Sequence, residues 1–92
     1  MSEPLTNAER RELKAKAQRL EPLLKVGQAG VSDAFIQSLN DALGKHGLVK
    51  VKFAAFKEEK KTLAPEIAER SGSELITRVG NVAVFYRRSS QS

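Results

Sequence analysis

The chain has 92 residues, enough for one hydrophobic core and too few for two, so we expect a single domain over residues 1–92. Its 40% hydrophobic and 29% charged residues match an ordinary globular protein and exclude bulk disorder, and the lack of cysteine excludes disulfides and thiolate chemistry. The net charge of +5 favours polyanionic partners, because neutralised phosphates release condensed counterions.

The N-terminal segment is polar rather than signal-like, and no apolar run in the sequence approaches the roughly 18 residues of a membrane span, so we expect a cytoplasmic protein.

Thr6 followed by Glu9 has the spacing of a capping box, and apolar residues then recur at helical intervals until Pro22. This pattern predicts a first helix over residues 7–20.

A short apolar run at residues 23–26 ends at a glycine and has the size of a buried strand. The four-residue loop Gly27-Gln28-Ala29-Gly30 follows it. Ser32 is a good N-cap and Gly47 is suited to a left-handed C-terminal position, so a second helix is predicted over residues 33–46.

Residues 48–56 alternate with a period of two, which predicts a strand that has Lys50 and Lys52 on one face and apolar side chains on the other. A third helix follows and ends at Gly72. Because Pro65 lacks a backbone donor, this helix is expected to become regular only near Thr62.

The chain should end in a hairpin, because two β-rich runs, residues 75–79 and 82–88, are separated only by Gly80-Asn81. A two-residue turn fixes the register. We therefore expect Arg78 and Arg87 to share one face of the hairpin with Ile76 and Phe85. The predicted pairs are Val79 with Val82, Arg78 with Ala83, Thr77 with Val84, and Ile76 with Phe85.

These elements predict an α/β domain with the order α-β-α-β-α-β-β and a four-stranded mixed sheet packed with helices. Its core should span about residues 5–88, followed by a flexible tail at residues 89–92.

The Gly27–Gly30 loop is the most informative feature, because it lies between a strand and a helix N-terminus. Glycines let a backbone approach a ligand closely, and the positive end of the helix dipole favours an anion beside Val31 and Ser32. KH domains clamp an RNA backbone with such a Gly-x-x-Gly loop. The alternative interpretation is an ordinary tight connection between a strand and a helix.

Basic side chains on the strands could extend this site into a positive surface, although the alternative is a solvated sheet face. The candidate RNA-binding residues are Lys25, Gly27, Gln28, Ala29, Gly30, Lys50, Lys52, Arg78 and Arg87. His46, the only histidine, fits a helix C-terminus better than a general base, and Phe85 and Tyr86 are interpreted as structural. We find no metal, cofactor or nucleophile motif, and therefore expect no enzyme.

Several separated segments in the right order resemble the CRM domain (chloroplast RNA splicing and ribosome maturation), whose single-domain bacterial form is YhbY-like. The resemblance spans Leu5 to Arg88. The segments are Leu5-Thr6, Glu9-Arg10, Val26-Gly27-Gln28-Ala29-Gly30-Val31, Lys45-His46-Gly47-Leu48-Val49-Lys50-Val51-Lys52, Ser71-Gly72, Val79-Gly80 and Phe85-Tyr86-Arg87.

The resemblance implies a fold similar to the C-terminal domain of translation initiation factor three. It also implies a ribosome-assembly factor that binds ribosomal RNA of large-subunit precursors through the loop and its basic surroundings. We expect the protein to be a monomer. Two positions depart from the family pattern: Gln28 stands where a lysine is common, and Gly47 where an acidic residue is common. Gln28 can donate hydrogen bonds to phosphate but brings no charge.

Two other functions remain open at this point. One is a protein-interaction module that docks on a ribosomal protein or an assembly GTPase, and the other is a small enzyme acting on RNA.

Overall fold

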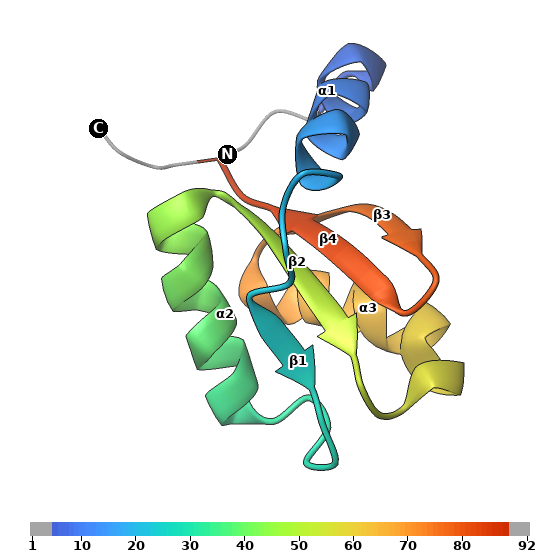
Figure 1. Ribbon diagram of the computed structural model, residues 1–92. Helices are drawn as coiled ribbons and strands as arrows, with labels where there is room; N and C mark the ends of the chain where they lie inside the picture. Colours follow the sequence, from blue (N-terminus) through green and yellow to red (C-terminus); the bar gives the residue numbers. More distant parts are fainter. Residues whose placement is uncertain (1–4, 89–92) are drawn as a thin grey trace.

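The computed structural model describes residues 5–88, so the tail predicted at residues 89–92 lies outside the described part of the chain. The observed order agrees with the prediction and adds one 3-10 turn, η1, before the third helix (Figure 1). The elements are α1 (Asn7–Ala17), β1 (Leu24–Val26), α2 (Asp33–His46), β2 (Leu48–Phe53), η1 (Lys57–Glu59), α3 (Lys60–Ser71), β3 (Glu74–Val79) and β4 (Val82–Tyr86).

The helix boundaries follow from local capping. The capping box predicted at Thr6 and Glu9 is present. Helix α2 has the predicted bounds, with the Ser32 hydroxyl accepting from the amide of Phe35 at 3.1 Å and Gly47 at a φ of 78°. Both caps satisfy backbone groups that a helix end would otherwise leave unpaired.

Two predicted helix boundaries were wrong, and strands β2 and β4 end at Phe53 and Tyr86 rather than at residues 56 and 88. Helix α1 ends at Ala17 rather than at residue 20, because the Lys50 ammonium donates to the carbonyls of Ala17 and Leu20, each at 3.1 Å, and holds the chain in a turn. Helix α3 begins at Lys60, before Thr62. It contains Pro65 near its start, where the missing donor costs only one intrahelical hydrogen bond.

The four strands form one mixed sheet with the order β1-β2-β4-β3 (Figure 1). Strand β1 is parallel to β2, and the other two neighbouring pairs are antiparallel. Helices α2 and α3 cover one face of the sheet, whereas α1 rests on part of the opposite face. None of the helices within residues 5–88 is long and apolar enough to span a membrane.

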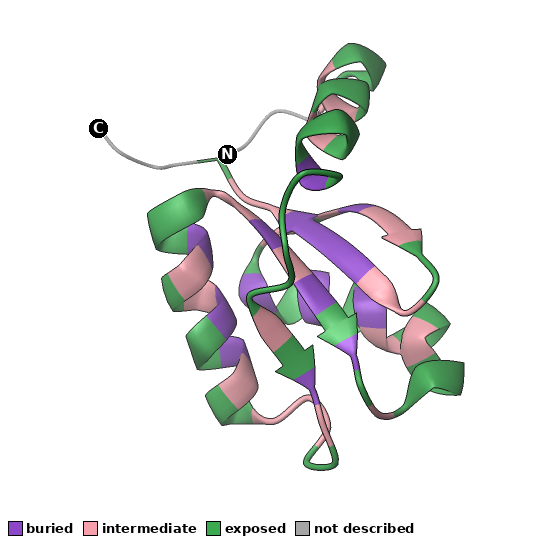
Figure 2. Cartoon of the chain, in the orientation of Figure 1, coloured by how far each residue is buried: buried purple, intermediate pink, exposed green. Residues whose placement is uncertain are grey.

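The core is divided by the sheet into two unequal parts (Figure 2). The main core lies between the sheet and helices α2 and α3, and it includes the fully buried Phe53 and Phe85. The smaller core under α1 consists of Ala17, Ile76 and Val84. Phe85 is therefore structural, as predicted.

A β-bulge in β3 overturns part of the predicted hairpin register. Three of the predicted pairs are present, but Leu75 rather than Ile76 pairs with Phe85. The shift between Leu75 and Thr77 turns Ile76 toward α1, while Phe85 points into the main core. The prediction that these two side chains share a face was therefore wrong, because a bulge adds an unpaired residue and reverses the alternation beyond it.

Candidate nucleic-acid interface

The Gly27–Gly30 loop is a tight, open turn between β1 and α2. The amide of Gly30 donates to the carbonyl of Gly27 at 2.9 Å, and Gln28 and Ala29 between them are exposed. Gly30 has a φ of +74°, a conformation that glycine adopts without strain. At Gly27 an added Cβ would meet no atom within 4 Å, so this side of the loop is accessible to a ligand.

The loop leads into the N-terminus of α2, where the backbone amides and the helix dipole favour an anion. Asp33 adds a negative charge in this first turn. Arg70 of α3 offsets that charge by donating to the Asp33 carboxylate at 2.8 Å, and it also donates to the carbonyl of Val31 at 2.9 Å. Sequence reasoning missed Arg70, because no sequence signal relates α3 to this loop.

Other connections gather at the same end of the sheet as the loop (Figure 1). The carbonyl of Val26 accepts from the amides of Ala54 and Ala55 at 3.0 and 2.9 Å. The amide of Phe53 donates to the carbonyl of Asn81 in the hairpin turn at 2.7 Å. The loop, the segment after β2 and the hairpin turn are thus fixed to one another by the backbone.

The three predicted lysines lie on one face of the sheet. Lys25 and Lys52 are paired in the register of β1 and β2, and both are exposed. Like charges directly opposite each other on neighbouring strands repel, so a bound anion would stabilise this pair. Lys50 lies on the same face but is half-buried and caps the C-terminal end of α1.

The two predicted arginines lie on the other face. Arg78 pairs with Ala83, whose side chain belongs to the main core. Arg87 donates to the Asn40 side chain at 2.8 Å, to the Asn40 carbonyl at 3.0 Å and to the Ser71 carbonyl at 2.9 Å. Arg87 therefore links α2 to the end of α3, and the structure does not bring the arginines together with the lysines.

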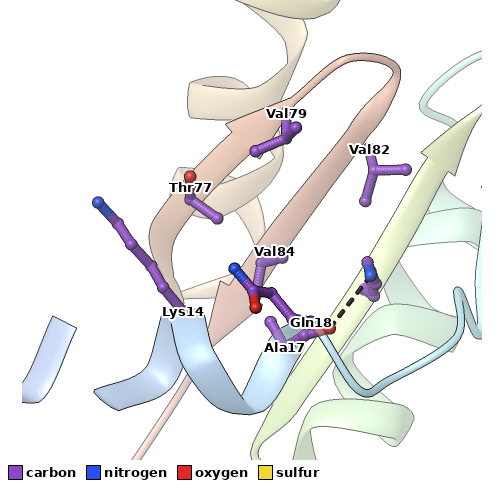
Figure 3. Close-up of a pocket in the computed structure, with 8 residues that line it drawn as sticks. Lys14, Ala17, Gln18, Thr77, Val79, Val82 and Val84 are labelled. Carbon is purple, nitrogen blue, oxygen red and sulfur yellow. Dashed lines mark hydrogen bonds between the residues drawn. The ribbon is translucent and has the colours of Figure 1, made fainter. Parts of the chain in front are cut away.

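A groove between α1 and the hairpin extends the lysine face (Figure 3). Its volume is about 360 Å³, and its apolar floor comes mainly from strands β3 and β4. Polar and basic side chains also line the groove. They are Lys14, Gln18 and Lys50, and the valines that line it are Val79, Val82 and Val84.

Contacts remote from the loop fasten α1 to the C-terminal end of β4. The backbone amide of Thr6 and the side chain of Arg88 both donate hydrogen bonds to the Glu9 carboxylate. These bonds, the Thr6 bond more than the Arg88 bond, hold the pKa of the Glu9 carboxyl below its ordinary value.

Within residues 5–88, no group of three His, Asp or Glu side chains is placed to hold a metal ion.

Comparison with known proteins gives consistent matches over almost the whole chain. The model of the CRS1 / YhbY (CRM) domain family matches residues 5–87. YqeI of Bacillus subtilis, named a probable RNA-binding protein, is 34% identical over 89 residues, which cover 96% of this chain and 93% of YqeI. PA4753 of Pseudomonas aeruginosa, named in the same way, is 31% identical over 86 residues, covering 92% and 83% of the two chains.

A solved structure agrees with the fold described above. The solution structure of the hypothetical protein SAV1595 from Staphylococcus aureus, described as a candidate RNA-binding protein, superposes with a TM-score of 0.80. The two chains are 31% identical, and the match covers 96% of this chain and 93% of the other. The predicted fold class is thereby confirmed.

Proposed function

Because this chain belongs to the CRS1 / YhbY (CRM) domain family, we propose that it is a non-catalytic RNA-binding protein that acts in the cytoplasm as a ribosome-assembly factor. Its ligand in this proposal is ribosomal RNA of large-subunit precursors. The observation that carries the proposal is the position of the Gly27–Gly30 loop, which opens α2 beside the exposed Lys25 and Lys52.

The loop is the proposed phosphate site. The backbone around Gly27 is accessible, and the exposed Gln28 amide can donate to a phosphate oxygen without adding charge. The helix dipole of α2 contributes a partial positive charge at the same place, and Arg70 reduces the opposing effect of Asp33. Ala29, exposed at the tip of the loop, would contact the RNA by its backbone.

The lysine face is the proposed contact for neighbouring phosphates. Lys25 and Lys52 repel each other in the unbound protein, so a phosphate between them removes an unfavourable interaction as well as adding a favourable one. Lys50 adds charge to this face while it caps α1. Arg78 would reach only RNA that bends around the hairpin edge. Arg87 is not a proposed contact, because three hydrogen bonds within the protein hold its side chain between α2 and the end of α3.

Contacts of this kind recognise the shape and backbone of an RNA more than its sequence. We therefore expect modest sequence specificity and a strong dependence of affinity on salt.

A second candidate function is a protein-interaction module that docks on a ribosomal protein or an assembly GTPase. The observation in its favour is the apolar surface of the hairpin, where Val79 is 70% exposed beside the groove under α1.

Sedimentation of cell extract through a sucrose gradient distinguishes the two functions. RNA binding predicts that the protein migrates with large-subunit precursors and that ribonuclease releases it. The double variant Lys25→Gln/Lys52→Gln should migrate as free protein. Its matched control, Arg11→Gln/Lys45→Gln, removes two exposed charges from the helices and should still co-migrate. Co-migration that survives ribonuclease, or that the lysine variant retains, would refute the proposal in favour of the interaction module.

A further inference from the structure

Phe56 has an unusual backbone and an unusual exposure for a phenylalanine. Its φ of 55° makes it the one non-glycine residue with a positive φ in the described part of the chain. Bulky side chains rarely adopt this left-handed conformation, because it brings Cβ close to the backbone. The residue is also 42% exposed, in contrast to the fully buried Phe53 and Phe85.

The conformation of Phe56 is maintained on both sides. The amides of Ala54 and Ala55 donate to Val26, and the amide of Glu59 donates to the Phe56 carbonyl at 3.1 Å, which starts the turn η1. Strain that surrounding contacts maintain is common where a side chain has to be held in a functional position. These hydrogen bonds fix Phe56 relative to the end of β1, from which the Gly27–Gly30 loop begins.

The ring lies against the loop itself. A Cβ built on Gly30 would be 3.5 Å from the Phe56 Cε2 atom and 3.7 Å from Cζ, which is van der Waals contact. The aromatic ring is therefore adjacent to the backbone at which the proposed function puts a phosphate. Lys57 and Lys61, which follow closely along the chain, are both exposed and basic.

We propose that Phe56 is a stacking platform for an unpaired base of the RNA, next to the nucleotide whose phosphate contacts the Gly27–Gly30 loop. An exposed aromatic ring beside cationic side chains and a phosphate-binding backbone is the combination by which proteins hold single-stranded nucleic acid. The inference rests on the proposed RNA-binding function and adds to it that the RNA at this end of the sheet is single-stranded.

The test uses the full chain, a short fluorescent oligouridylate as the single-stranded probe and a blunt-ended RNA duplex as the paired probe. Phe56→Leu keeps the apolar bulk and removes the aromatic face. We expect it to bind oligouridylate about 5- to 150-fold more weakly, the range for loss of one base stacked on an aromatic side chain, and to bind the duplex as the wild type does. Leu23→Ala is the control, because Leu23 is 55% exposed and aliphatic, and it should change neither affinity.

Phe56→Trp gives an independent readout, because the chain contains no tryptophan. This variant should keep its affinity for oligouridylate, and its indole fluorescence should be quenched when a base stacks on it. Circular dichroism and thermal unfolding establish that each variant is folded.

Three results would overturn the inference, and they separate it from the proposed function. If Phe56→Leu binds oligouridylate like the wild type while Gly27→Asp does not, the stacking platform is refuted and the phosphate site stands. Indole fluorescence of the Phe56→Trp variant that stays unquenched at saturating oligouridylate refutes stacking in the same way. A wild-type protein that binds neither probe refutes both the inference and the proposed function.

Discussion

Replacement of Gly27 by aspartate would put a carboxylate at the proposed phosphate site with little effect on the fold. Gly27 is not among the glycines with a positive φ, and its Cβ position is open. A carboxylate about 5 Å from a phosphate repels it by roughly 0.8 kcal/mol in bulk water and by about 3.3 kcal/mol at an effective dielectric constant near 20. The affinity for RNA should therefore fall by roughly 4-fold to more than 100-fold.

Gly44→Asp is the matched control, because it changes the net charge by the same amount. A Cβ at Gly44 also meets no atom within 4 Å, and the residue lies eleven positions beyond the start of α2. At a rise of about 1.5 Å per residue this is roughly 16 Å from the loop, about twice the Debye length of about 8 Å at physiological salt. The affinity of the Gly44→Asp variant for RNA should therefore stay close to that of the wild type.

Fluorescence anisotropy with a fragment of large-subunit ribosomal RNA, at one fixed salt concentration, measures both variants. Equal losses in the two variants would mean that net charge, rather than the loop, determines binding. An unchanged affinity in folded Gly27→Asp would remove the loop from the mechanism.

Three further predictions concern other parts of the chain. Arg87→Met should lower the free energy of unfolding by about 2 to 4 kcal/mol in urea titrations, because the carbonyls of Asn40 and Ser71 lose a charged donor. A change below about 0.5 kcal/mol would contradict the role of Arg87 in linking α2 to the end of α3. Lys52→Gln should reduce the slope of log affinity against log salt by about 1, whereas an unchanged slope would mean that this lysine contacts no phosphate. Glu9→Gln should lower the melting temperature at neutral pH. The pKa of the Glu9 carboxyl is lowered in the folded state, so its stabilising effect is present above the unfolded-state pKa of about 4.3 and is lost as the pH falls through the folded-state pKa. The melting temperatures of the variant and the wild type should therefore converge in acid. A difference in melting temperature that persists in acid would contradict this.

Much of the fold could be predicted because its signals are local. The caps at Thr6 and Ser32 and the terminating glycines act within a few residues, and the observed helices have these ends. The alternation of β2 also survives in the structure, with Val49, Val51 and Phe53 in the main core. The loop between β1 and α2 is visible in the sequence for the same reason.

The remaining features depend on contacts between segments that are far apart in the chain. The bulge in β3 reflects packing against two cores at once, because Ile76 fills the space under α1 while Leu75 packs against the main core. The face on which Arg87 lies is set by the pairing of β2 with β4, which joins residues 30 to 38 positions apart. The contact of Phe56 with Gly30 likewise needs the end of β2 to be placed beside β1. A period-two or period-3.6 pattern carries none of this information.

The bulge in β3 has a further consequence for how the sheet meets other molecules. Strands β1 and β3 are the outer strands, and an outer strand exposes unpaired backbone groups that can recruit a strand from a second chain. Strand β1 has only three residues, and β3 is interrupted by its irregularity and carries Glu74 and Arg78. Neither edge strand offers a long, flat template for another strand. The bulge that turns Ile76 into the space under α1 therefore also protects the protein against edge-to-edge aggregation.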